Sequence, residues 1–194
     1  SNTTNKKQLK KIVKELICEE AEVKHHDTDI TINVSNVFTP SDLTNMVQGI
    51  TDTSRVGDQV KLESVQFKLT VGYTIPAVVR IMLIQWHDNS ADNAINATDI
   101  FQFFTAAFTA NTINSPYNID QSDKFTVLYN RAIALEPNYA GSTNERYVKT
   151  WVSKKIRRTL KFNEAVTSGT NKIYLLTHSD SATAGAINGY CRVR

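Results

Sequence analysis

QVKLESVQFKLTVGYTIPAVVRIMLIQWH, residues 59–87, is the stretch that decides the fold of this chain. In its first half apolar side chains alternate with polar ones, as on a strand with one buried face. The alternation changes phase near Glu63 and Ser64, and such a slip predicts a bulge or bend inside one long strand. Residues 78–87 are almost continuously apolar, as in a strand covered on both faces. Two consecutive strands joined by a tight connection at Pro76 are therefore expected.

Strand-like runs continue on both sides of this stretch, separated by Asn, Asp, Ser, Thr and Gly. Further strands are expected at residues 30–34, 125–135, 147–162, 172–179 and 189–194. Residues 36–55 are polar and irregular, whereas apolar residues recur at a helical spacing in residues 99–110 and favour one short helix capped by Thr98 or Asp99. About eight strands and a single internal helix predict an all-β class, an antiparallel sandwich of two sheets, rather than a parallel α/β fold.

The first 24 residues instead follow the helical period of about 3.6 residues. Their apolar side chains share one face of the predicted helix; they are Leu9, Ile12, Val13, Leu16 and Ile17. The basic residues of the same segment are Lys6, Lys7, Lys10, Lys11 and Lys14. A lone helix of this length is marginal in water, so the apolar stripe needs a partner, either the body of its own domain or copies of itself. We divide the chain into a basic amphipathic α-helical arm, residues 1–26, and a β-rich body, residues 27–194.

A second basic cluster occupies the strand expected at residues 147–162. Alternation places Val148, Val152, Ile156, Leu160 and Phe162 on one face of that strand. The other face carries Lys149, Lys155, Arg157 and Lys161. This face is either an ordinary solvated surface, with edge lysines that block unwanted pairing, or a contact for nucleic acid made by Lys155, Arg157 and Lys161. Only Trp151 and Tyr147 offer rings nearby, so contacts to the phosphate backbone are expected.

Composition excludes several classes of function. The net charge is only +3, so basic residues matter where they cluster. Cys18 and Cys191 are too few for a disulfide scaffold, which makes reduced thiols the expectation, and no apolar run approaches the roughly 20 residues of a membrane span.

Sequence motifs of catalysis are missing as well. No phosphate loop, dinucleotide fingerprint or nucleophile elbow is found, and the four histidines lack the spacing of zinc ligands. We therefore do not expect an enzyme. A hydrolase would require four residues to converge in one pocket, namely His87, Asp88, His178 and Asp180.

Five stretches in order give the chain a resemblance to known proteins: EVKHH (22–26), RVGDQV (55–60), VRIMLIQWHDN (79–89), KFTVL (124–128) and KIYLLTHSD (172–180). With the basic arm, they resemble the single jelly-roll coat proteins of satellite tobacco necrosis virus and its relatives, and the similar capsids of small circular single-stranded DNA viruses.

The resemblance implies an eight-stranded antiparallel jelly roll that assembles into a small icosahedral shell, with about sixty identical subunits as the simplest closed arrangement. It places the protein in the virion, assembled in the host cytoplasm or nucleus around single-stranded RNA or DNA, and identifies no host receptor. By position, the genome contacts fall on Lys6, Lys7, Lys10, Lys11 and Lys14, and the helix-to-helix contacts on Leu9, Ile12, Val13, Leu16 and Ile17.

The resemblance also implies calcium between subunits, held by Glu20 or Glu22 with the carbonyls of Val56 and Gln59. The alternative to a capsid protein is a trimeric β-sandwich module that binds a ligand or carbohydrate, with the arm as its helical stalk. The size of the assembly separates the two.

Overall fold

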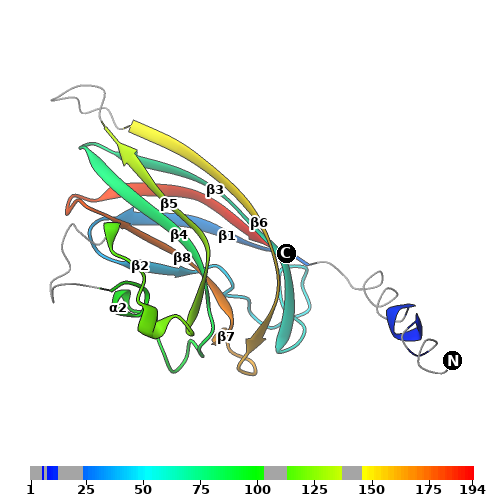
Figure 1. Cartoon of the computed structure of the whole chain (residues 1–194). Coiled ribbons are helices and arrows are strands. Elements are labelled where there is room, and N and C mark those ends of the chain that lie inside the picture. Colours follow the sequence, from blue (N-terminus) through cyan, green and yellow to red (C-terminus); the bar gives the residue numbers. More distant parts are fainter. Residues whose placement is uncertain (1–5, 7, 13–23, 103–112, 137–145) are drawn as a thin grey trace.

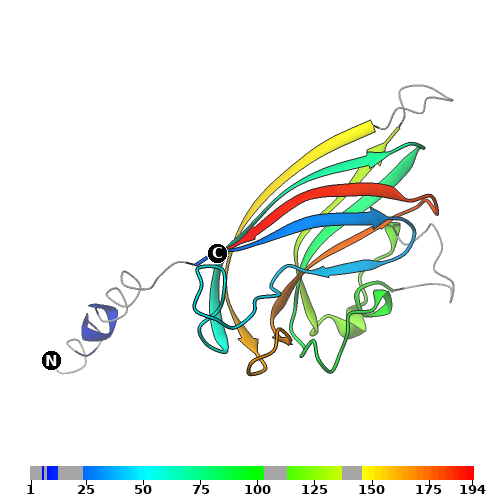
Figure 2. The ribbon, with the colours of Figure 1, turned by 180° about the vertical axis from the view of Figure 1, so that it is seen from behind.

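The computed structural model describes residues 6, 8–12, 24–102, 113–136 and 146–194. They form two antiparallel sheets that face each other as a sandwich, seen from two sides in Figures 1 and 2. The order in the five-stranded sheet is β1 (His26–Val34), β9 (Gly185–Val193), β3 (Gln59–Tyr73), β6 (Arg146–Phe162) and β7 (Gly169–Thr170). The order in the four-stranded sheet is β2 (Thr39–Asp42), β8 (Lys172–Ser179), β4 (Ala77–Trp86) and β5 (Phe125–Leu135).

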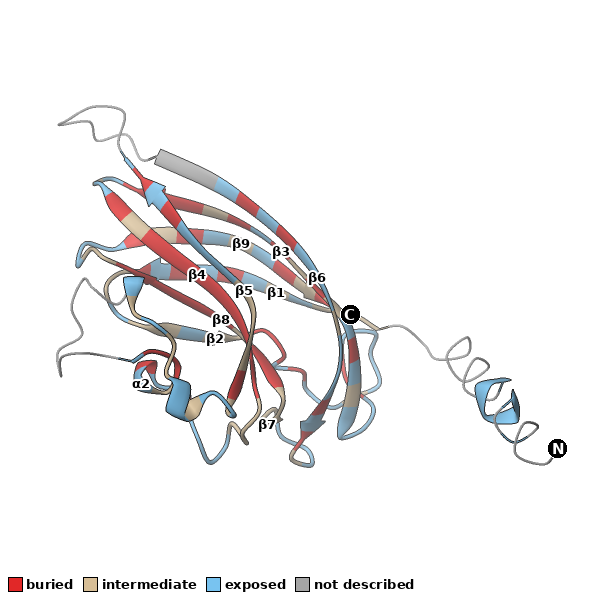
Figure 3. Cartoon of the chain, in the orientation of Figure 1, coloured by how far each residue is buried: buried red, intermediate tan, exposed pale blue. Residues whose placement is uncertain are grey.

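Strand β4 is buried on both faces, as its continuous apolar run predicts (Figure 3). Its side chains Val79, Ile81 and Leu83 join the main core between the two sheets. The alternate side chains Met82, Ile84 and Trp86 join a second cluster on the outer side of the four-stranded sheet. There α2 (Ala97–Ile100) and its flanks cover them. The sandwich thus has an extra layer on one side, while the outer face of the five-stranded sheet lacks one in the described chain.

The predicted slip inside β3 is confirmed. The register between β3 and β6 shifts between Leu62 and Ser64, so the inward-facing positions change parity there. The amides of Glu63 and Ser64 both donate to the carbonyl oxygen of Arg194, at 2.7 and 3.1 Å. On the partner strand Arg157 has a φ of 51°, the left-handed conformation that a bulge accommodates. The bulge gives β3 its bend and binds it to the last residue of the chain.

Other boundaries differ from the sequence-based expectation. Strand β2 lies in the stretch expected to be irregular, because its TPSD sequence carries no alternation and is paired through its backbone with β8. Strand β9 begins at Gly185, before the expected start at residue 189. The two-residue strand β7 was not expected at all.

The internal helix is shorter than expected. Helix α2 has Asn96 as its N-cap residue, whose amide donates to the carboxylate of Asp99 at 3.0 Å. Phe101 is already extended and forms a bridge with Tyr117. The prediction of a helix through residues 101 and 102 is therefore wrong, because Phe101 packs into the outer cluster; residues 103–112 lie outside the described chain.

Two buried cations fasten one end of the sandwich. The guanidinium of Arg55 donates to the carbonyls of Gly57, Glu164 and Val166 at 2.7 to 2.9 Å and lies 4.4 Å above the ring centroid of Phe162. On the same ring, 4.7 Å from its centroid, lies the ammonium group of Lys172. Arg55 is the first residue of the RVGDQV stretch. Through Arg55 this stretch connects the turn at Gly57 to the turn at Glu164 and Val166.

Among the described residues, no helix has the length and apolar composition needed to cross a bilayer.

Candidate nucleic-acid interface

The alternation expected on β6 is present wherever its side chains are described. Val152, Leu160 and Phe162 are buried and Ile156 is half-buried against the core. The exposed side chains on the outward positions are Lys149, Trp151, Ser153, Lys155, Arg157, Thr159 and Lys161. The basic residues named as nucleic-acid contacts on this strand therefore share one accessible face.

Strand β6 is also close to an edge of its sheet. The short strand β7 pairs only with Lys161 and Phe162, and no other described strand pairs with that side of β6. Lys154 and Arg158 lie opposite the buried residues Val65 and Leu62, yet both are exposed. Cations at such positions discourage a strand of another molecule from adding to the edge. Lys154 and Arg158 are therefore the residues that protect the edge of the sheet. The outward-facing basic residues of β6 remain accessible to a ligand.

Charge on the outer face is unevenly distributed. The acid Asp27 lies on β1, where the guanidinium of Arg192 donates to its carboxylate at 2.6 and 2.7 Å. On β6, by contrast, Lys149, Lys155 and Lys161 take part in none of the ion pairs of the described chain. An anionic ligand is therefore favoured over β6 and disfavoured over β1.

A row of three side chains crosses this face and was missed by the sequence reasoning. Lys68 on β3 is paired in register with Trp151 on β6 and with Tyr190 on β9. Its ammonium nitrogen lies 5.4 Å from the ring centroid of Trp151 and 5.8 Å from that of Tyr190. Trp151 is 72% exposed and Tyr190 42%. Each residue stands at an outward position of its strand, but only the register brings them together. The side chain of Tyr147 lies outside the description.

The described part of the arm is helical, as predicted. Lys6, Lys10 and Lys11 are helical and exposed. Leu9 and Ile12 are 64% and 52% exposed, so the body does not cover this end of the apolar stripe. The other predicted arm contacts lie outside the described chain; they are Lys7, Val13, Lys14, Leu16 and Ile17. Of the two partners considered for the apolar stripe, the body of the same chain does not cover Leu9 and Ile12.

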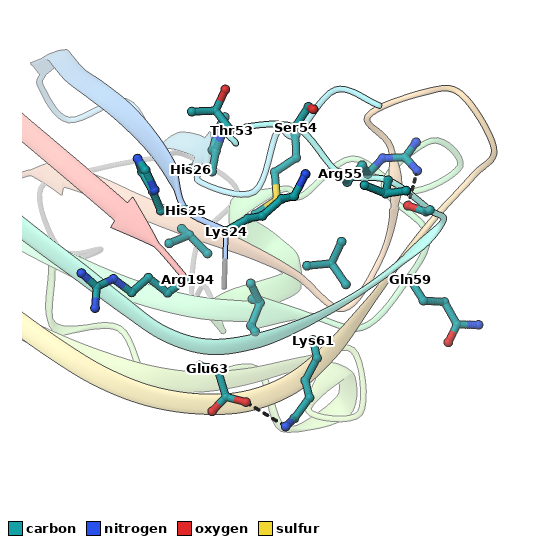
Figure 4. A pocket seen from close by; sticks show the side chains of 16 residues that line it. Lys24, His25, His26, Thr53, Ser54, Arg55, Gln59, Lys61, Glu63 and Arg194 are labelled. Atoms are coloured by element: carbon teal, nitrogen blue, oxygen red, sulfur yellow. Dashed lines mark hydrogen bonds and ion pairs between the residues drawn. The ribbon is translucent and has the colours of Figure 1, made fainter. Parts of the chain in front are cut away.

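A cavity of about 610 Å³ lies where the arm joins the body (Figure 4). Its wall includes Lys24, His25 and His26 at the root of the arm, the turn that contains Val56 and Gln59, and the end of β9. Apolar side chains also line it, namely Met46, Val60, Leu62 and Val193. The basic groups of its lining are Lys24, Arg55, Lys61 and Arg194, together with the two histidines.

This cavity contains the described half of the predicted calcium site and suits an anion better than a cation. Among the described residues of its lining, Glu63 has the one side-chain carboxylate; it accepts a hydrogen bond from Lys61 at 2.8 Å, and that bond lowers the pKa of the carboxyl group. Within the described ranges no three His, Cys, Asp or Glu residues gather as metal ligands. Calcium takes about 6 to 8 oxygens, and the carbonyls of Val56 and Gln59 alone fall far short. Glu20 and Glu22 lie outside the described chain, so calcium stays a prediction.

The four residues that a hydrolase would need do not converge. His87 follows the end of β4, and its ring nitrogens lie 3.0 Å from Asn171 Oδ1 and 2.9 Å from Thr126 Oγ1. His178 is paired in register with Arg80, so roughly 20 Å of strand separates it from His87. It is fully buried against the ring of Phe101.

No protein-family model matches this chain, and no curated protein is significantly similar to it.

Proposed function

We propose that this chain is the coat protein of a small virus, which assembles into an icosahedral shell around a single-stranded nucleic acid genome. The observation that carries the proposal is the strand order. The strand orders β1-β9-β3-β6 and β2-β8-β4-β5 in the two facing sheets are consistent with a jelly roll, in which two Greek keys are wrapped into two four-stranded sheets. Strand β7 adds only two residues to one edge. The jelly roll is one of the folds from which viral shells are built.

Exposed apolar side chains support self-assembly. The loops of the body expose Val37, Val47, Ile50, Val56 and Ile119 by 62% to 95%. Apolar groups at such positions gain from burial against another subunit. Identical subunits favour closed point-group symmetry, and an icosahedral shell of about sixty copies is the simplest such arrangement for a jelly roll of this kind.

The basic residues supply the attraction for the genome. In the proposed shell, Lys6, Lys10 and Lys11 lie in an exposed helix, and Lys155, Arg157 and Lys161 on an exposed strand face. Each phosphate that these cations neutralise releases a bound counterion, so binding weakens steeply as salt is raised and does not depend on sequence. The apolar stripe that starts at Leu9 and Ile12 packs against arms of neighbouring copies and orders the lysines.

The test is the mass of the purified full chain by light scattering or native mass spectrometry, with the ratio of absorbance at 260 and 280 nm taken from the same peak. The proposal expects a particle of about sixty subunits that carries nucleic acid. A matched variant replaces the five arm lysines by Gln, namely Lys6, Lys7, Lys10, Lys11 and Lys14. It is expected to carry much less nucleic acid. A monomer or trimer without nucleic acid, at all salt and calcium concentrations, would overturn the proposal in favour of the trimeric binding module.

A further inference from the structure

We propose that the outer face of the five-stranded sheet is a base-stacking site, at which unpaired bases of a single-stranded nucleic acid stack on Trp151 and Tyr190 while β6 lysines bind its phosphates. The inference rests on the proposed function and deepens it, because it adds base contacts to the phosphate contacts of the arm.

The exposure of Trp151 is the first argument. Tryptophan is highly buried on average, and the other tryptophan of this chain, Trp86, is fully buried. Trp151 is 72% exposed on an open sheet face, and Tyr190 is a second exposed ring on that face. Strands in a sheet lie about 4.8 Å apart, so two rings on strands either side of β3 stand about 10 Å apart. Lys68 fills that gap and contacts both rings through their π faces. The two rings therefore form two separate surfaces on which bases can stack.

The charge next to the platforms is the second argument. Along β6 the outward positions are, in order, Lys149, Trp151, Ser153 and Lys155, so one lysine stands two residues before the indole and another four residues after it. Those separations are about 6.6 and 13 Å along the strand. A base stacked on Trp151 therefore has an adjacent phosphate within reach of Lys149, while Lys155 lies further along the same row, where the next part of the nucleic acid would pass. None of the described ion pairs uses these two lysines.

The same features select the kind of ligand. Stacking on an open sheet requires bases with a free face, which a single strand offers and a duplex does not. Aromatic platforms beside a basic strip are the usual means of binding single strands without a sequence preference. A neutral sugar would use the rings but leave Lys149 and Lys155 without a role. On β1, Asp29 faces Tyr190, so the nucleic acid is expected to pass from Tyr190 toward Trp151 and the lysines of β6, and not onto β1.

The two tryptophans make the test direct. Because Trp86 is fully buried, quenching of the emission on adding nucleic acid reports Trp151. The full chain is titrated with oligothymidylate of about 12 nucleotides and with an abasic oligomer of the same length, which has the phosphates without the bases. Arm lysines bind both oligomers alike. The proposal expects strong quenching and tighter binding with oligothymidylate only.

Variants locate the effect. Trp151→Ala is expected to weaken oligothymidylate binding about 5- to 100-fold and to leave abasic binding unchanged. Trp151→Tyr keeps a ring and is expected to bind within a few-fold of the original chain, which guards against a misfolded alanine variant. Val166→Ala removes another exposed apolar side chain, 53% exposed, and is the control that leaves binding unchanged.

Equal quenching and affinity with the two oligomers, or quenching by a neutral oligosaccharide in place of oligothymidylate, would overturn the inference. Protection of Trp151 from both by contact with another subunit would overturn it as well. Failure of the proposed function is read separately, from the mass of the particle, so a shell that binds its genome without stacking is distinguished from a chain that forms no shell.

Discussion

At the scale of single residues, Lys172 is a buried cation whose lost hydration must be replaced by oxygens of the protein. Its ammonium group is fully buried and contacts Thr44 O, Thr167 O and Asp42 Oδ2 at 2.6 to 2.9 Å. Burial lowers the pKa of the lysine, while the charge of Asp42 acts in the opposite direction. The group is stable because three oxygens surround it, so those oxygens in turn depend on it.

Replacing Lys172 by Met is expected to lower the free energy of unfolding by about 3 kcal/mol, because the two carbonyls and the carboxylate lose their common partner. Denaturation by urea measures the change. The matched control is Lys61→Met, which removes the exposed pair with Glu63 and is expected to change stability by less than about 1 kcal/mol. Equal effects of the two substitutions would contradict a structural role for the buried ammonium group.

At the scale of elements, the seam between β1 and β9 is expected to respond to pH through Asp27. The hydrogen bond from Arg192 lowers the pKa of this carboxyl group below its usual value of 3.8. A lowered pKa in the folded state means that the stabilisation is complete well above pH 3.8 and is lost as the pH falls through the folded pKa. The pair is largely exposed, so its contribution is small.

Comparison of the parent chain with Asp27→Asn in urea denaturation tests this. The difference in stability is expected to be constant at pH 5 and above, and to shrink below pH 3.8 as the pH falls through the lowered pKa of the folded state. Asp29→Asn, on the same strand and facing Tyr190, is the control without an ion pair in the described chain. A difference that grows on acidification would show that the sign is wrong.

The turn into β9 depends on close packing at Gly185. A Cβ atom there would lie 2.1 Å from the ring of Tyr73. That ring cannot retreat easily, because its hydroxyl donates to the carbonyl of Val34 at 2.6 Å.

Gly185→Ala is therefore expected to cost about 1 to 3 kcal/mol of unfolding free energy through overpacking. Gly57→Ala is the matched control, since nothing lies within 4 Å of a Cβ atom at that glycine, and its effect is expected to stay within about 0.5 kcal/mol. Thermal unfolding of the two variants, measured in parallel, tests this. If Gly185→Ala left the stability unchanged, the Tyr73 ring would have to be able to move to another position.

At the scale of the whole molecule, the arm and the sandwich are expected to be separable. Every member of the main core lies at or beyond Ile30, and Leu9 and Ile12 are exposed. Removal of residues 1–23 is thus expected to change the free energy of unfolding of the body by less than about 0.5 kcal/mol and to reduce bound nucleic acid sharply.

Urea denaturation at one salt concentration and the absorbance ratio at 260 and 280 nm measure the two effects on the same samples. A loss of about 2 kcal/mol or more on truncation would mean that the arm packs on its own body, the alternative left open for its apolar stripe.

The strands best predicted were those with a strong local pattern. Residues 125–135 and 172–179 match β5 and β8 at both ends, and the phase slip in β3 is a bulge in the structure. The failures have a common cause. Strand β2 has no pattern of its own and exists through its pairing with β8. Helix α2 ends at Ile100 because Phe101 is drawn into the outer cluster, a contact that local spacing does not encode.

For the candidate interface, the sequence by itself determined the two-sheet class, the helical arm, and the separation of basic from apolar side chains on β6, since these follow from periodicity along one segment. Only the tertiary structure decided that Lys68, Trp151 and Tyr190 form one row, that Arg55 binds two turns together, and that Val56 and Gln59 line a cavity whose charged groups are mostly basic. Each of these depends on which residues of distant segments face each other, and a shift of one position in strand register would turn every side chain to the other face.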